Sequence, residues 1–183
     1  AHFDDPAFRS EASLVIDQSV RRMNAICASL AVLGRKPELV RRQADLNDIV
    51  RTGLTGLNGS LTGALNVRLQ ALPPVSIDPD EIQKVLTNLV LNANDAVGTG
   101  GVIDVATHRR GAWAVLSVSD NGRGMSQDFV AHSLFRPFRT TKDNGLGIGL
   151  YHSRKIVEAH HGRFEVESEE GRGSTFRVLL SAG

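Results

Sequence analysis

Two glycine-rich segments constrain what this chain can form more than any other feature. The first, residues 120–125 (DNGRGM), directly follows an apolar stretch that is typical of a strand, and the second, residues 145–150 (GLGIGL), opens a predicted helix. Glycine lets backbone N–H groups approach an anion closely, and a helix N-terminus adds a partial positive charge. One such segment is usually an ordinary turn. Two of them in this context predict a pair of loops around an anionic ligand.

A long helix is expected upstream of both loops, from about Asp78 onward. Asp78 suits the N-cap, Pro79 the first helical position, and Glu81 the third, which together are a strong helix start. Asn88 and Asn92 are four residues apart, so they lie close together on the helix, beside its apolar stripe. The stripe predicts the buried face: Ile82, Val85, Leu86, Leu89, Val90, Ala93 and Val97.

The remaining pattern predicts an α+β, two-layer α/β sandwich, since strands and helices do not alternate as regular βαβ units. A Rossmann fold is excluded because no buried parallel strand precedes the second glycine segment and no acidic residue follows at the required offset. We expect helices at 45–65 and 150–159, and the glycines of residues 45–65 weaken the first of these. We expect strands at 66–69, 102–107, 113–119, 163–168 and 174–181.

The N-terminal part predicts a long amphipathic helix over residues 13–33, with apolar side chains three or four residues apart. Residues 34–37 (GRKP) break the pattern. Two interpretations stay open: a helix packed on its own domain, and one half of a hairpin that pairs with a second copy of the chain.

Composition narrows the function further. The net charge of +1 argues against nucleic acid as a partner, and the single Cys27 excludes an internal disulfide. No apolar run reaches the length of about twenty residues that a bilayer span requires. The histidines and carboxylates show no zinc-site spacing.

Four segments, in this order, resemble the N box (Asn88 and Asn92), the G1 box (120–125), the F box (134–142) and the G2 box (145–150) of the GHKL ATPases. Among these, residues 46–180 are similar to the catalytic, ATP-binding domain of a sensor histidine kinase. The resemblance implies the Bergerat fold over residues 37–183. It also implies that residues 1–36 are the loop and second helix of the dimerisation hairpin.

The resemblance implies roles at the adenine end of an ATP site. Asp120, expected to be partly exposed, would accept a hydrogen bond from the exocyclic amine of adenine, which favours ATP over GTP. Gly122 and Gly124 would let the loop wrap the base and sugar, and Thr175 would lie near the base.

At the phosphate end, Asn92 matches the magnesium ligand of the family, a hard oxygen donor that suits Mg²⁺. Asn88 stands where hydrolytic GHKL members have a water-activating glutamate. Because an amide cannot accept that proton, the site should hold ATP for transfer rather than hydrolyse it. Asp95 is a departure, since many histidine kinases have a lysine at this position.

Between the glycine loops, residues 126–144 would form the ATP lid. Phe135 and Phe138 would anchor it. Lys142 and Arg139 would contact the triphosphate; the alternative is that both are only surface cations of a basic loop. The backbone of the second loop would cradle the phosphates through Gly145, Leu146, Gly147 and Gly149.

The function expected is that of a two-component sensor kinase. Mg²⁺-bound ATP would donate its γ-phosphoryl group to a histidine for relay to a response regulator receiver domain, within a homodimer formed through the N-terminal helix. None of the six histidines has the sequence context of a phosphoacceptor. The first helix of the hairpin, which carries the phosphoacceptor histidine in the family, is therefore expected to be absent from this segment. A cytoplasmic location is expected for the segment, and a membrane anchor elsewhere in the full-length protein stays open. The alternatives are a GHKL-type serine kinase and a nucleotide-sensing module without chemistry.

Overall fold

The computed structural model of this chain describes residues 38–57, 59–140 and 146–182. The predicted N-terminal helix and the division at residue 36 therefore lie outside the described residues, as do Lys142 and Gly145. The described part of the chain forms a sheet covered by helices.

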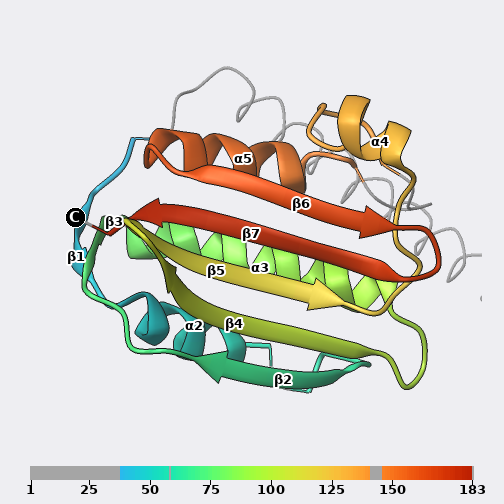
Figure 1. Ribbon diagram of the computed structural model, residues 1–183, viewed down its shortest axis with the longest axis horizontal. Helices are drawn as coiled ribbons and strands as arrows, with labels where there is room; N and C mark the ends of the chain where they lie inside the picture. Colours follow the sequence, from blue (N-terminus) through green and yellow to red (C-terminus); the bar gives the residue numbers. More distant parts are fainter. Residues whose placement is uncertain (1–37, 58, 141–145, 183) are drawn as a thin grey trace, which may run out of the picture. The chain divides into compact units, whose positions relative to one another are not determined.

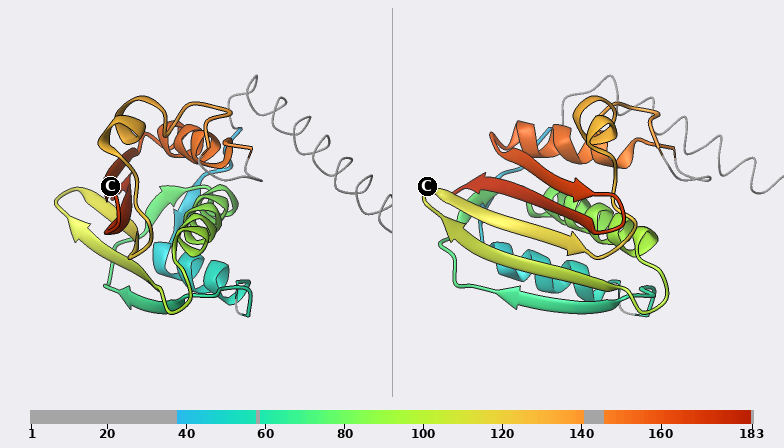
Figure 2. Two further views of the ribbon diagram at one scale, coloured as in Figure 1. Left: turned by 90° about the vertical axis from the view of Figure 1, so that its right-hand side faces the viewer. Right: turned by 45° about the vertical axis from the view of Figure 1, so that its right-hand side comes forward.

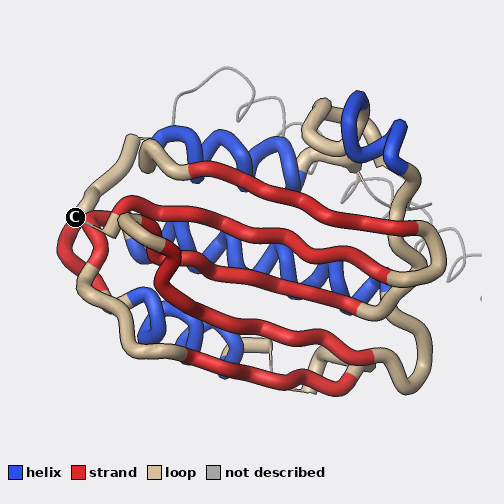
Figure 3. Tube along the Cα trace, viewed as in Figure 1, coloured by secondary structure: helices blue, strands red, loops and turns tan. Residues whose placement is uncertain are grey.

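A five-stranded mixed sheet forms one layer of the fold (Figure 3). Only β2 and β4 pair in parallel, and the other neighbours are antiparallel. A separate pair joins β1 (Arg42–Ala44) to β3 (Val75–Ile77). In spatial order, the sheet consists of β2 (Ala64–Leu69), β4 (Val102–Arg110), β5 (Trp113–Asp120), β7 (Gly173–Ser181) and β6 (Arg163–Glu169).

Three helices form the second layer and cover one face of the sheet (Figures 1 and 2): α2 (Leu46–Thr55), α3 (Pro79–Ala96) and α5 (Gly149–Ala159). A short helix, α4 (Gln127–His132), packs near β6. The two layers confirm the predicted α/β sandwich. Among the described helices, none is long and apolar enough to cross a membrane.

Helix α3 forms as its sequence predicts. The Asp78 carboxylate caps it by accepting hydrogen bonds from the backbone N–H groups of Asp80 (3.1 Å) and Glu81 (3.2 Å). Proline at the first position loses no helical hydrogen bond there. All seven predicted apolar residues are buried, against α2, α5 and the sheet.

Helix α2 is shorter than predicted, because it ends at Thr55 rather than near residue 65. Its C-cap is Gly56, and Gly59 has a positive φ of 84° that a helix cannot contain. The chain then turns toward α3, where the Asn94 side-chain oxygen accepts a hydrogen bond from the backbone N–H of Thr62 at 2.7 Å. The short elements β1, β3 and α4 were not predicted.

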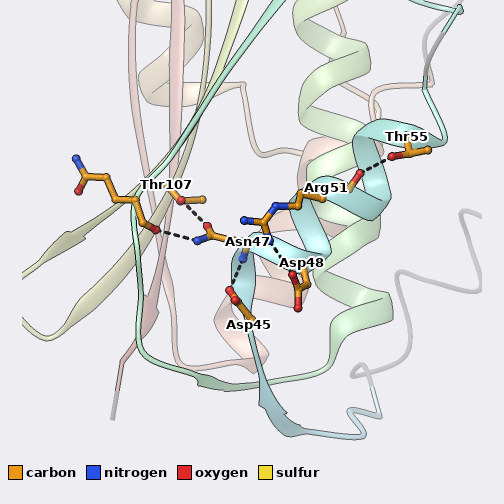
Figure 4. Close-up of polar contacts among 7 residues, drawn as sticks. Asp45, Asn47, Asp48, Arg51, Thr55 and Thr107 are labelled. Carbon is orange, nitrogen blue, oxygen red and sulfur yellow. Dashed lines mark hydrogen bonds and ion pairs between the residues drawn. The ribbon is translucent and has the colours of Figure 1, made fainter.

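Asn47 fixes α2 to the sheet edge (Figure 4). Its buried amide donates through Nδ2 to the carbonyl of Gln70 (2.8 Å) and accepts through Oδ1 from the Thr107 hydroxyl (2.6 Å). The backbone N–H of Asn47 is itself bound by the N-cap, Asp45. One side chain thus joins α2 to the end of β2 and to β4.

Candidate functional site

Asp120 ends strand β5 on the face that the helices cover, since Val118, two residues earlier, belongs to the core. It is buried, 8% exposed, rather than partly exposed as predicted. Burial raises the pKa of Asp120, and hydrogen bonds from the backbone N–H groups of Gly122 (2.9 Å) and Ser174 oppose the rise. A buried carboxylate with a perturbed pKa at a strand end is a candidate binding group.

The two glycines after Asp120 are required by the packing of the loop itself. A Cβ on Gly122 would lie 2.4 Å from the carbonyl oxygen of Ala96, at the end of α3. A Cβ on Gly124 would lie 1.9 Å from the carbonyl oxygen of Glu169, and Gly124 also has a φ of 63°. The loop is therefore clamped between α3 and the β6–β7 turn, a reason for glycine that involves no ligand.

Thr175, which is expected near the base, lies on the other face of the sheet from Asp120. Side chains alternate along a strand, and Phe176 points into the core, so Thr175 points to the other face of the sheet. There its hydroxyl bonds with that of Ser119, at 2.8 Å. Ser174 is the direct cross-strand partner of Asp120 and is buried on the same face.

Ser168, which the sequence analysis missed, connects the first lid residues to this end of the site. Its buried hydroxyl donates to the carbonyl of Gly173 (3.1 Å) and contacts the Ser174 hydroxyl (2.9 Å). It also accepts from the backbone N–H of Met125 (2.9 Å), and its carbonyl accepts from the Gln127 amide (2.6 Å). A serine in a strand gives no local signal for such a position.

Asn88 and Asn92 are both half-buried on α3. The Asn88 Nδ2 donates to the hydroxyl of Ser153 on α5, at 2.9 Å. A cleft of about 480 Å³ runs along α3 and includes Asn88. It is lined by Asp80, Gln83, Lys84, Thr87, Asn88 and Leu91.

The second glycine loop leads into α5, as predicted. Gly147 has a φ of 68°, and a Cβ there would lie 2.5 Å from the backbone oxygen of Arg139. The Gly147 carbonyl accepts from the N–H of Phe138 at 3.1 Å, so loop and lid are joined by their backbones. Leu146 is half-buried just before this contact. The helix begins at Gly149, with its N-terminus directly after the loop.

Of the two predicted lid anchors, Phe135 packs on the body of the domain and Phe138 does not. Phe135 packs on Phe164 of β6, with ring centroids 5.4 Å apart, and the guanidinium of Arg154 lies 5.1 Å from its ring centroid. Leu134 is buried in the core. Phe138 is instead 50% exposed, at a φ of 62°, so its side chain is no anchor.

Arg139 and Asn92 are the predicted cation and the predicted metal ligand that lie within the described residues. Arg139 is exposed beside the second glycine loop. Within the described residues, no group of three or more His, Cys, Asp and Glu side chains is arranged to hold a metal ion. A metal site at Asn92 would thus rely on few protein ligands, the usual pattern for Mg²⁺ that is bound with phosphates.

Comparisons with known proteins agree with this geometry. Residues 77–183 match the family described as histidine kinase-, DNA gyrase B-, and HSP90-like ATPase. Sensor histidine kinase ZraS of Escherichia coli (strain K12) is 36% identical over 170 residues, which are 91% of this chain and 36% of ZraS. Sporulation kinase E of Bacillus subtilis (strain 168) is 33% identical over 91% of this chain and 23% of the kinase. The chain thus spans about a third or less of these relatives.

Solved structures show the same fold. The catalytic domain of histidine kinase ThkA overlaps 78% of this chain and 95% of its own length, with a TM-score of 0.70 and 27% identity. The described elements, the two glycine loops and the asparagine-bearing helix correspond to one domain of such a kinase. The chain belongs to the histidine kinase-, DNA gyrase B- and HSP90-like ATPase family, and it shares its fold with the catalytic domain of a histidine kinase.

Proposed function

We propose that this chain binds Mg²⁺-ATP between Asp120 and the second glycine loop and supplies the γ-phosphoryl group to a histidine of the intact kinase. The observation that carries the proposal is the buried carboxylate of Asp120 at the end of β5. An ionised carboxylate accepts hydrogen bonds only, so it would select the exocyclic amine of adenine and reject the carbonyl of guanine.

Asn88 supports transfer over hydrolysis. Hydrolysis at this position needs a base that takes a proton from water, and a carboxamide cannot do so. The Nδ2 of Asn88 is bound by Ser153, which is consistent with a positioning role. A site without a base keeps ATP intact until a nucleophile arrives in line with the γ-phosphate.

Asn92, one turn further along α3, would hold Mg²⁺ through its carboxamide oxygen. The metal would neutralise phosphate charge when it is bound. The glycine loop before α5 would contribute backbone N–H groups and the helix N-terminus to the phosphates, through Leu146, Gly147 and Gly149. The lid would close over them with Arg139 and, outside the described residues, Lys142 and Gly145.

The receiver of the phosphoryl group is proposed from the relatives. Histidine kinase ThkA has been solved in complex with the response regulator protein TrrA, and this chain overlaps that kinase with a TM-score of 0.81. We infer that the intact protein passes the group from its histidine to a response regulator. Residues 1–36 would pair with a second copy as part of the dimerisation hairpin.

The direct test is transfer of label from γ-labelled ATP to a separately produced phosphoacceptor domain of the full-length protein. We expect acid-labile label on that domain and none on the 183-residue chain alone. Asp120→Asn serves as the control that lacks the base-recognising charge. Acid-stable label on serine would favour a serine kinase, and binding without any transfer would favour a nucleotide-sensing module.

A further inference from the structure

The carboxamide of Asn88 is held against the first turns of α5. Its Nδ2 donates to the Ser153 hydroxyl at 2.9 Å, across 65 residues of sequence. Ser153 is only 2% exposed, so this hydroxyl faces α3 rather than solvent. The contact joins the helix that carries Asn88 and Asn92 to the helix that begins at the second glycine loop.

Gly149 packs close to the same carboxamide. A Cβ built on Gly149 would lie 2.3 Å from Oδ1 of Asn88 and 3.2 Å from its Nδ2. The two glycines of this region differ in kind, because Gly147 has a positive φ of 68° and Gly149 is an ordinary helical residue. A side chain at position 149 would meet the Asn88 carboxamide, and this explains the glycine.

We propose that Ser153 and Gly149 are positioning residues for the phosphate end of the site, acting through Asn88. Ser153 fixes one end of the carboxamide with a hydrogen bond, and Gly149 leaves the space in which it lies. The amide then fixes the position of α3 relative to the start of α5, so that Asn92 and the glycine loop face the same phosphates. The inference rests on the proposed function, because it assumes that ATP binds there.

Packing alone is the competing explanation for Ser153. A small buried side chain between two helices can be kept only for its size. That explanation predicts the same loss on changing Ser153 whether or not Asn88 is present. The positioning role predicts that the loss disappears once the carboxamide is gone, which a double-mutant cycle measures.

The experiment is calorimetric titration of the 183-residue chain with Mg²⁺-ATP, in wild type and in the Asn88→Ala background. Ser153→Ala should weaken binding about tenfold in wild type, the effect of one hydrogen bond left unmade. Gly149→Ala should weaken binding at least as much, because its Cβ displaces the carboxamide. In the Asn88→Ala background neither change should weaken binding further. Ser153→Thr keeps a hydroxyl and should bind better than Ser153→Ala.

Thermal melting without nucleotide gives an independent readout. Gly149→Ala should lower the melting temperature in wild type, where its Cβ meets the carboxamide, and should not lower it in the Asn88→Ala background. Equal losses of affinity in both backgrounds would overturn the proposal, as would no loss in either. If Ser153→Ala does not fold, the comparison of Gly149→Ala in wild type and in the Asn88→Ala background still tests the proposal. A wild-type chain that does not bind ATP would instead refute the proposed function, and the melting comparison would still test the Asn88–Gly149 contact.

Discussion

The imidazole of His160 accepts a hydrogen bond from the backbone N–H of Asp78, 82 residues earlier, through Nε2 at 2.9 Å. This fixes the tautomer, because Nδ1 must then carry the proton that it donates to the carbonyl of Ile156, at 2.7 Å. The Asp78 carboxylate also accepts from the N–H of Val40, at 2.8 Å. The end of α5, the start of α3 and the segment before β1 thus meet at Asp78 and the buried His160.

Protonation of His160 should therefore destabilise the domain. Burial lowers the pKa of His160, assisted by Arg41 and opposed by the bond to Ile156 and by Asp78 and Glu81. Since the folded pKa lies below the unfolded value of about 6.5, its contribution to stability is complete above that pH and is lost as pH falls through the folded pKa. Urea unfolding across this range should show a smaller pH dependence for His160→Ala. Parallel curves would refute this role.

At neutral pH the same variant measures the hydrogen bonds themselves. His160→Ala leaves the buried N–H of Asp78 without its acceptor, so we expect a loss of about 1–3 kcal/mol in the free energy of unfolding. His132→Ala is the matched control, since His132 is an exposed histidine on α4. It should change stability by less than about 0.5 kcal/mol.

His161→Gly should stabilise the chain. His161 has a φ of 56°, in the left-handed region, at the C-terminal end of α5. That conformation costs a residue with a Cβ about 1–2 kcal/mol, partly offset by the greater unfolded-state entropy of glycine. A gain of about 0.5–1 kcal/mol in chemical denaturation is expected. His161→Ala keeps the Cβ and should give no such gain; an equal gain from alanine would contradict the backbone argument.

Gly124→Ala should destabilise the domain in the absence of any nucleotide. Its Cβ would meet the Glu169 carbonyl at 1.9 Å, and overpacking of this kind typically costs about 1–3 kcal/mol. Gly98→Ala is the control, because nothing lies within 4 Å of its Cβ. Unchanged melting of Gly124→Ala would mean that the loop adapts, and that its glycine serves the ligand alone.

The sequence was sufficient where structure is decided locally. The cap, the proline and the apolar stripe of α3 act within one helix, so its start and buried face could be predicted. Asp120 was found because an acidic residue between a strand and a glycine loop is conspicuous. The glycines of residues 45–65 were noted, but their effect was underestimated, and α2 ends ten residues early.

What the sequence could not provide were contacts between distant polar residues. Ser153, Ser168 and His160 are buried and form hydrogen bonds with residues 43 to 82 positions away. The residues next to them in the sequence do not indicate these contacts. The face of the sheet on which Thr175 lies could have been predicted. Phe176 had to face the core, and alternation then places Thr175 on the other face and Ser174 beside Asp120.

Asn92→Ala should separate the metal from the nucleotide. If Asn92 holds Mg²⁺, the variant should lose about tenfold or more in affinity for Mg²⁺-ATP and much less for ATP in the presence of a chelator. Titrations of wild type and variant under both conditions provide the comparison. Equal losses with and without metal would show that Asn92 is not the metal ligand.

The most direct test of the account is the nucleotide preference of the chain and its dependence on Asp120. Calorimetric titration should show Mg²⁺-ATP bound far more tightly than Mg²⁺-GTP, since a bond to a charged acceptor contributes about 1.5–3 kcal/mol. Asp120→Asn should lose most of this affinity while the domain stays folded, because it removes a buried charge and keeps an oxygen for the Gly122 N–H. Equal affinity for the two nucleotides, or undiminished ATP binding by Asp120→Asn, would contradict the assignment of Asp120 as the base-recognising group.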